Sequence, residues 1–343
     1  MELKRFDIVF PILAVALMLS LFGCGSTDRK PTSISATSQL PLSTVEPTLI
    51  RTPIQMERTG AVFVSQWGTE GMGKWQFHGP EGIAVALDGS VYVADAPNHR
   101  ILKFTSTGVL ITQWGEEGTD DGEFSLPLDV SVASDGSVYV ADFDNHRVQK
   151  FTSEGAFVSK WGAEGTDDGY FHQARAVAVA LDDSVYVVDY SNNRVQNFSS
   201  EGEFINKWGT TGTGDGQFQD PEGIAVASDG SVYVVDYSNN RIQKFTSEGV
   251  FVNKWGTLGT SDGQFNYPLG LAVSSNGYVY VADAFNHRIQ KFTSEGVFVN
   301  KWGTDGTGVG NFHQPRAVTV ASDGTIYVSD YGNKRIQKLS PGS

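Results

Sequence analysis

The chain has 343 residues and a formal net charge of −14 at pH 7, and it contains 39 glycine, 21 phenylalanine and 7 tryptophan residues. Hydrophobic residues make up 40% of the sequence, which excludes a chain that is disordered throughout, and the wealth of glycine and aromatic residues is untypical of a helical protein. The single cysteine excludes an intrachain disulfide and a cluster of thiolate metal ligands, and the acidic balance argues against a nucleic-acid partner.

Residues 1–24 have the pattern of a secretory signal peptide. Lys4 and Arg5 precede an apolar run over residues 8–22, which is shorter than the roughly 20 residues that a membrane-spanning helix needs. The run ends in Leu-Phe-Gly-Cys at residues 21–24, which resembles a bacterial lipobox. The resemblance implies that Cys24 is lipidated, for instance by palmitate. It also implies an extracytoplasmic protein that is held at the cell envelope, on the outer membrane or the cell surface, by this lipid alone. An ordinary signal peptide and an uncleaved anchor are the alternatives.

Residues 25–59 form the second segment. They are rich in serine, threonine and proline and show no hydrophobic periodicity. This composition predicts a disordered tether, partly extended at its prolines, that holds the following domain away from the membrane. A structured loop of this length is the alternative, and such loops are uncommon in compact domains.

Residues 60–341 contain one unit repeated six times. A tryptophan, an aspartate and an arginine each recur at intervals of 47 residues. The tryptophans are Trp67, Trp114, Trp161, Trp208, Trp255 and Trp302. Repeats of about 40–50 residues that are built from strands are typical of a β-propeller. We therefore predict an all-β domain, a six-bladed β-propeller with almost no helix.

Each unit contains four short segments with the character of strands. In the fourth unit these are residues 223–227, 232–236, 241–246 and 250–255, which are separated by turns. They predict a four-stranded antiparallel blade. The sixth unit ends after its third strand, and residues 61–67 supply a spare strand at the other end of the domain. This N-terminal strand is expected to complete the last blade and close the ring.

The units resemble NHL repeats. The resemblance rests on segments such as 223–226, 232–236 and 239–245 of the fourth unit, and on Asn-His pairs that precede the repeated arginine. These pairs are Asn98-His99, Asn145-His146 and Asn286-His287. The resemblance implies a six-bladed propeller. It leaves the function open, because NHL propellers include RNA-binding modules, a zinc-dependent amidating lyase, sensor domains of bacterial receptor kinases and many surface proteins.

Several repeated polar residues are predicted to be architectural. The pattern Asp-x-x-Asn-x-Arg occurs in every unit, and a single ligand rarely needs six equivalent contacts. For the same reason His99, His146 and His287 are interpreted as turn residues. Loops such as 119–122 and 166–169 are rich in aspartate and raise the alternative of a calcium site, but they lack the spacing of an EF-hand, and we expect no calcium.

The residues that differ between units are the candidates for a binding site. One position, just before each first strand, is expected to ring the mouth of the central channel. In chain order it holds Glu81, Leu128, Arg175, Glu222, Leu269 and Arg316. The pattern predicts two neighbouring pairs, Arg175 with Glu222 and Arg316 with Glu81, separated by the leucines. Such pairs suit a charged ligand, and exposed surface pairs that bind nothing are the alternative.

A second ring is predicted at the residue that follows each repeated aspartate. Four of its positions are aromatic, namely Phe143, Tyr190, Tyr237 and Tyr331. Aromatic side chains beside arginine suit the recognition of a partner, whereas packing beneath the loops is the alternative.

These features predict a monomeric, surface-tethered binding module without catalytic activity. It would take a protein, a peptide or a small charged ligand at the channel mouth on the top face, without a cofactor. The alternative is an extracytoplasmic enzyme, a metal-dependent lyase or a lactonase-like hydrolase. The amidating lyase that NHL repeats resemble holds zinc on histidines at positions where this chain has Glu, Leu and Arg. Three loop histidines, His78, His172 and His313, remain as candidate zinc ligands.

Overall fold

The computed structural model of the chain describes residues 61–341. The predicted signal peptide, the lipidated Cys24 and the tether lie outside these residues. Within residues 61–341, no helix is long and apolar enough to cross a lipid bilayer.

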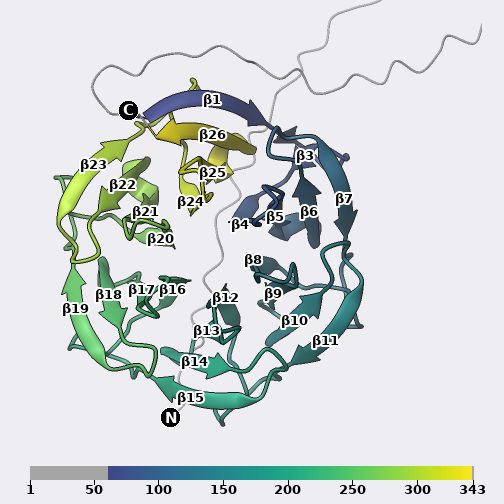
Figure 1. Ribbon diagram of the computed structural model, residues 1–343, viewed down its shortest axis with the longest axis vertical. Helices are drawn as coiled ribbons and strands as arrows, with labels where there is room; N and C mark the ends of the chain where they lie inside the picture. Colours follow the sequence, from purple (N-terminus) through teal and green to yellow (C-terminus); the bar gives the residue numbers. More distant parts are fainter. Residues whose placement is uncertain (1–60, 342–343) are drawn as a thin grey trace, which may run out of the picture. The chain divides into compact units, whose positions relative to one another are not determined.

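The described residues form six four-stranded sheets arranged around a central channel, which confirms the predicted six-bladed β-propeller (Figure 1). Blade 1 consists of β4 (Pro80–Val85), β5 (Val91–Asp95), β6 (Arg100–Phe104) and β7 (Leu110–Trp114). Blade 2 consists of β8 (Pro127–Val132), β9 (Val138–Asp142), β10 (Arg147–Phe151) and β11 (Phe157–Trp161). Blade 3 consists of β12 (Ala174–Val179), β13 (Val185–Asp189), β14 (Arg194–Phe198) and β15 (Phe204–Trp208). Blade 4 consists of β16 (Pro221–Val226), β17 (Val232–Asp236), β18 (Arg241–Phe245) and β19 (Phe251–Trp255). Blade 5 consists of β20 (Pro268–Val273), β21 (Val279–Asp283), β22 (Arg288–Phe292) and β23 (Phe298–Trp302). Blade 6 consists of β24 (Pro315–Val320), β25 (Ile326–Asp330), β26 (Arg335–Pro341) and β1 (Ala61–Trp67).

The other elements are short. A parallel pair, β2 (Thr69–Glu70) and β3 (Gln76–Phe77), lies in the loop that leads into blade 1. Three 3-10 helices of three residues each follow the second strands of blades 1, 5 and 6. They are η1 (Ala96–Asn98), η2 (Ala284–Asn286) and η3 (Tyr331–Asn333). The prediction of almost no helix is confirmed for the part of the chain that the structure describes.

The core lies between adjacent blades rather than inside any one of them. Each of the six hydrophobic clusters combines side chains from two neighbouring blades. Second strands such as β17 are buried along their whole length, whereas fourth strands such as β19 alternate between half-buried and exposed residues. Each sheet in this ring buries both faces against its neighbours, so that only its outer strand has solvent-exposed residues along one side.

The N-terminal strand closes the ring as predicted. In blade 6, β1 pairs antiparallel with β26, the last strand of the chain (Figure 1). Its Phe63 is fully buried, and its Trp67 lies 5.9 Å from Phe104 of blade 1 and 6.1 Å from Tyr327 of blade 6. The strand therefore contributes to the cores on both faces of blade 6, through Phe63 between blades 5 and 6 and through Trp67 between blades 6 and 1.

The closing junction uses the same hydrogen bonds as the junctions of blade 1 with blade 2 and of blade 2 with blade 3. Tyr327 and Lys338 of blade 6 both donate to the carbonyl oxygen of Ser106 in blade 1, at 3.4 and 2.9 Å. Between blades 2 and 3, Tyr139 and Lys150 bind the carbonyl oxygen of Ser200 in the same way, at 3.4 and 3.1 Å. The hydrogen bonds that close the ring are therefore of the same kind as those between neighbouring blades elsewhere in it.

The Asp-x-x-Asn-x-Arg pattern forms a buried support beneath the loops, as expected. In blade 4, Asp236 accepts hydrogen bonds from Arg241 Nε at 2.6 Å and from the backbone of Gln219 at 2.8 Å. Arg241 also donates to backbone carbonyls of the loop that leads into the blade, including that of Thr213 at 2.7 Å. Because these groups satisfy one another, they fix the loop that carries the channel-lining residues.

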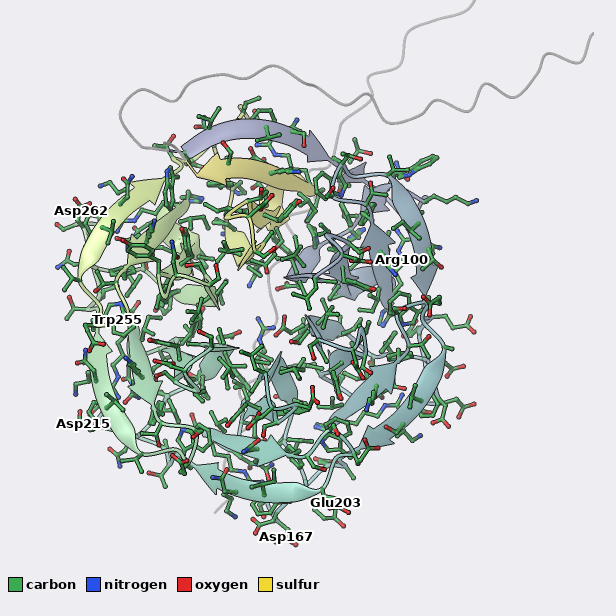
Figure 2. The ribbon with its side chains drawn as sticks, in the orientation of Figure 1. Arg100, Asp167, Glu203, Asp215, Trp255 and Asp262 are labelled. Carbon is green, nitrogen blue, oxygen red and sulfur yellow. The ribbon has the colours of Figure 1, made fainter. Side chains whose placement is uncertain are left out.

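The Asp-rich loops are held by lysines of the outer strands. Lys254 lies 2.6 Å from Asp215 and Lys301 lies 2.6 Å from Asp262, and both aspartates lie at the outer circumference (Figure 2). Lys160 and Lys207 bind Asp121 and Asp168 in the corresponding way. Each of these carboxylates therefore has a cationic partner.

Candidate functional site: the channel cavity

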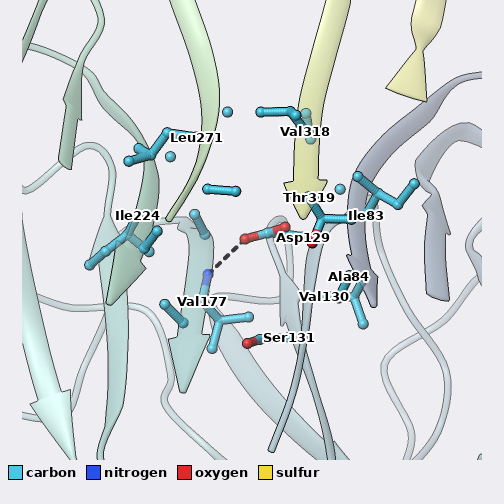
Figure 3. Close-up of a pocket in the computed structure, with 18 of the residues that line it drawn as sticks. Ile83, Ala84, Asp129, Val130, Ser131, Val177, Ile224, Leu271, Val318 and Thr319 are labelled. Carbon is cyan, nitrogen blue, oxygen red and sulfur yellow. Dashed lines mark hydrogen bonds between the residues drawn. The ribbon is translucent and has the colours of Figure 1, made fainter. Parts of the chain in front are cut away.

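A cavity of about 190 Å³ runs along the channel and is lined by the first strands of all six blades. This volume is far above the roughly 10–15 Å³ that a single water needs. Apolar residues such as Ile83, Ile224, Leu271 and Val318 line part of the wall (Figure 3). The cavity therefore offers an apolar wall together with a small number of charged groups, as small-ligand sites commonly do.

The charged residues of the predicted mouth all line this cavity. Sequence analysis placed them just before the first strands, but each is the second residue of its strand, as Glu222 is in β16. The strand starts earlier than predicted because its pairing with β17 is irregular between Pro221 and Ile224, which lets the proline open the strand.

The four charges form one cluster rather than two separate pairs. Arg175 Nε contacts Glu222, and Arg316 Nε lies 3.7 Å from Glu81, so that both predicted neighbours are confirmed. Arg175 also reaches across the channel to Glu81, at 3.9 Å, which the predicted separation by leucines did not anticipate. The long side chain of Arg175 allows this contact between blades 3 and 1.

The cluster is enclosed by the protein. Glu81 and Glu222 are each only 8% exposed, and the side chain of Arg175 is 13% exposed. The alternative of exposed surface pairs is therefore wrong. Burial raises the pKa of Glu222, and the nearby Arg175 and Arg316 oppose this effect. Burial alone would lower the pKa of Arg175, but the surrounding carboxylates outweigh it and raise that pKa.

A fifth charged residue, Asp129 of β8, also lines the cavity and was not predicted from the sequence. Its side chain faces the cavity and accepts a hydrogen bond of 3.0 Å from the backbone of Val177 (Figure 3). Burial raises its pKa to about 7, against hydrogen bonds and the charge of Arg175 that lower it. The other five blades have glycine or alanine at this position, so a comparison between blades could have found it.

Replacing Asp129 by asparagine is expected to stabilise the protein at about pH 8 and to have little effect at about pH 3.5. The raised pKa means that the stability Asp129 contributes is full below its ordinary pKa of 3.8 and is lost as the pH rises through about 7. Asparagine stays neutral and can still accept the Val177 N–H, so the gain is expected to be roughly 1–3 kcal/mol. Urea unfolding at both pH values measures it, and equal stabilities at the higher pH would contradict the assignment.

Two buried polar atoms of the cluster lack a hydrogen-bond partner among the described residues. They are Arg316 Nε and Glu222 Oε2. Glu222 Oε2 lies against Arg175 as an ion pair, and the Arg316 guanidinium lies 4.4 Å from the centre of the Tyr331 ring. Arg316 Nε is thus a donor with unused capacity that lines the cavity.

The four aromatic residues that were predicted to form a second circle around the channel mouth contact one another only in part. Phe143 and Tyr190 lie 6.0 Å apart, and Glu222 helps burial to raise the pKa of Tyr190 to about 12, which places Tyr190 near the cluster. The ring of Tyr237 lies 4.9 Å from that of Tyr267, a residue that was not predicted from the sequence, and the two rings are tilted by 33°. Tyr267 in turn lies 5.5 Å from Phe285, so two exposed aromatic residues extend the predicted set.

The candidate zinc ligands do not meet in the channel. His172 packs against the turn residue His146 at 5.7 Å, and His313 stacks on His287 at 5.2 Å. None of His78, His172 and His313 lines the cavity. Each turn histidine is held in the left-handed region, as His287 is at φ 55°, which confirms its predicted role in the turn.

Comparisons with known proteins agree with this fold. The family profile described as NHL repeat matches residues 77–104, 124–151, 218–245, 265–292 and 312–339. The third unit, over residues 171–198, is not among these matches, and it has Ala174 and Asp183 where the fourth unit has proline and glycine. No curated protein sequence matches the chain significantly.

Solved structures share the fold at low sequence identity. A protein of unknown function from Bacteroides thetaiotaomicron is 18% identical, with a TM-score of 0.62 over 84% of this chain and 83% of its own. A gluconolactonase from Xanthomonas campestris is 11% identical, with a TM-score of 0.59 over 82% of this chain and 89% of its own. A catalytically inactive virginiamycin B lyase from Staphylococcus aureus, solved with quinupristin, is 14% identical. Its TM-score is 0.55 over 86% of this chain and 99% of its own. The five repeat matches identify the chain as an NHL-repeat protein, and its six blades give it the six-bladed β-propeller fold, to which these solved structures are similar.

Proposed function

We propose that the protein is a non-catalytic binding module that takes a small zwitterionic ligand, or the charged end of a peptide, in the channel cavity. The observation that carries this proposal is the buried Arg316 Nε, which has no hydrogen-bond partner among the described residues and lies 3.7 Å from Glu81. A ligand carboxylate suits the forked donors of the arginine, and a ligand ammonium group suits the carboxylate. The buried position strengthens both interactions, because water competes less for them.

The arrangement of the cluster supports binding over metal-dependent catalysis. Arg175 lies between Glu222 and Glu81, so that a guanidinium already occupies the space between the two carboxylates. A metal ion at these oxygens would lie against that positive charge. The lyase and the lactonase with the same fold make an enzyme the second candidate, but likeness at this level of identity extends to the fold alone.

The proposal includes the setting predicted from the first 59 residues. A lipidated Cys24 and a flexible tether would hold a monomeric propeller outside the cytoplasm with its cavity open to small molecules and peptides. An acidic domain of this kind is not expected to bind nucleic acid.

A binding screen with the full-length protein tests the proposal. Amino acids, short peptides and other zwitterions are screened for an increase in melting temperature, because a ligand that binds the folded state raises it. Each hit is then measured on Arg316→Gln, which keeps a polar side chain at this position but shortens it and removes its charge. A hit should bind this variant at least about tenfold more weakly, which corresponds to about 1.4 kcal/mol. Lys207→Ala, at an exposed ion pair on an outer strand, serves as the control. Hits that bind all three proteins equally would refute the cavity as the binding site.

A further inference from the structure

A second group of metal-ligating side chains lies at the junction of blades 5 and 6, apart from the cavity. His287 follows η2 of blade 5, while Asp305 and His313 belong to the loop between β23 and β24. Asp305 Oδ1 lies 2.8 Å from His313 Nδ1 and 3.5 Å from His287 Nδ1. One ligand atom from each residue lies within 4.8 Å of the others. Two imidazoles and a carboxylate are thus gathered at one point between two blades.

The turn does not require a histidine at position 287. Its architectural task is to accept a hydrogen bond from the loop of the next blade, as His287 Nδ1 does from the backbone of Gln314 at 3.1 Å. Asn193 and Asn240 perform this task at the corresponding turns, at 2.9 and 2.8 Å. The imidazole therefore adds a capacity that asparagine lacks, which is strong binding of a transition metal.

The three ligand types occur together along the chain. The corresponding triad three blades earlier is His146, Glu164 and His172, again a histidine, an acid and a histidine. Glu164 forms a backbone bridge to Phe171 as Asp305 does to Phe312, so the acids occupy equivalent places. Where the turn residue is asparagine, neither a histidine nor an acid stands at the two loop positions, which hold Thr211 and Gln219, or Leu258 and Asn266. Two of the three turn histidines thus have both an acid and a second histidine in the next loop, whereas both are absent beside a turn asparagine. The exceptions are His99, whose loop has Glu117 and Ser125, and the turn residue Lys334, whose loop has Glu70 and His78.

We propose that His287, Asp305 and His313 form a site for a divalent transition metal of the zinc class, which ties the turn of blade 5 to the loop of blade 6. Two imidazoles and one carboxylate are a ligand set that zinc commonly takes, with water completing the coordination. Binding exchanges the hydrogen bond from Gln314 for a bond to the metal, and the exposed carboxylate of Asp305 is free to adjust. This site differs from the zinc site considered from the sequence, because it uses His313 with His287 instead of three loop histidines in the channel.

Metal binding to the full-length protein, produced without a polyhistidine tag and stripped with a chelator, tests the proposal. Equilibrium dialysis against zinc, followed by elemental analysis, is expected to give a bound ion that His287→Asn loses, so that the stoichiometry falls by one per chain. Cobalt should give visible absorption bands in the wild type that weaken in the same variant. Zinc is also expected to raise the melting temperature of the wild type more than that of His287→Asn.

The matched control is His99→Asn, which makes the same change at a turn whose loop carries Glu117 and Ser125 and no second histidine. It is expected to leave the stoichiometry unchanged. His287→Asn should fold, because asparagine fills the same turn in two other blades, and a melting temperature without metal close to that of the wild type verifies this. His313→Gln provides a second variant that leaves the turn intact. A wild type that binds no zinc, or a stoichiometry that neither His287→Asn nor His313→Gln lowers, would overturn the proposal.

Discussion

Deleting residues 60–68 is expected to lower the melting temperature of the propeller by more than about 10 °C or to abolish cooperative unfolding. The deletion removes β1 and with it the buried side chains of Phe63 and Trp67, each of which stabilises the fold by about 2–3 kcal/mol through burial. It also exposes the backbone edge of β26 and opens the core between blades 6 and 1. Calorimetry of the shortened and complete proteins measures the effect.

A pair of substitutions in β1 separates ring closure from a general effect of truncation. Phe63→Ala leaves the strand in place but creates a cavity, and it is expected to cost about 3–5 kcal/mol. The neighbouring Val64 is 37% exposed on the same strand, so Val64→Ala should cost much less. If the deletion unfolded at the same temperature as the complete protein, β1 would not be closing the ring.

Replacing Arg175 by methionine is expected to destabilise the protein by about 3–5 kcal/mol, because a buried ion pair loses one partner. Arg175 contacts both Glu81 and Glu222 and also lowers the pKa of Asp129, so its removal leaves three carboxylates together in the cavity. Burial already raises the pKa of Glu222, and the loss of the guanidinium should raise it further. The destabilisation should therefore shrink as the pH falls and the carboxyl groups are protonated. Urea unfolding at several pH values measures both effects.

Adding Glu222→Gln to Arg175→Met tests whether unpaired negative charge causes the destabilisation. The double variant removes one of the unpaired charges and should regain part of the lost stability, which simple loss of packing would not allow. Lys207→Ala, at an exposed ion pair, is expected to change stability by no more than about 1 kcal/mol. An equally small effect of Arg175→Met would show that the cluster behaves like a solvated surface.

The fold could be predicted from the sequence because its unit is repeated without a gap. The number of copies at the interval of 47 residues predicts the number of blades. The strand at residues 61–67 supplies the missing fourth strand of the sixth unit. The first strands were predicted to start too late, because Pro221 and its counterparts were interpreted as loop residues. A proline can open a strand where the pairing is irregular, and this irregularity is not visible in the pattern of residue types.

The site could be predicted only as far as equivalent positions were compared. Glu81, Arg175, Glu222 and Arg316 were found because one column of the repeat differs between blades. Asp129 stands in the next column, where the other blades have glycine or alanine, and the same comparison would have revealed it. The contact of His313 with His287 could not be found in this way. It joins a turn of one blade to a loop of the next, and only their packing in space brings them together.

The most direct measurement of the central claim is the dissociation constant of a zwitterionic hit for the wild type, Arg316→Gln and Lys207→Ala, obtained by titration calorimetry. If Arg316, whose Nε donates no hydrogen bond to a described residue, binds the ligand, Arg316→Gln should weaken binding at least about tenfold, while Lys207→Ala should leave it unchanged. The same dissociation constant for all three proteins would place the ligand elsewhere and contradict the assignment of the cavity as the binding site.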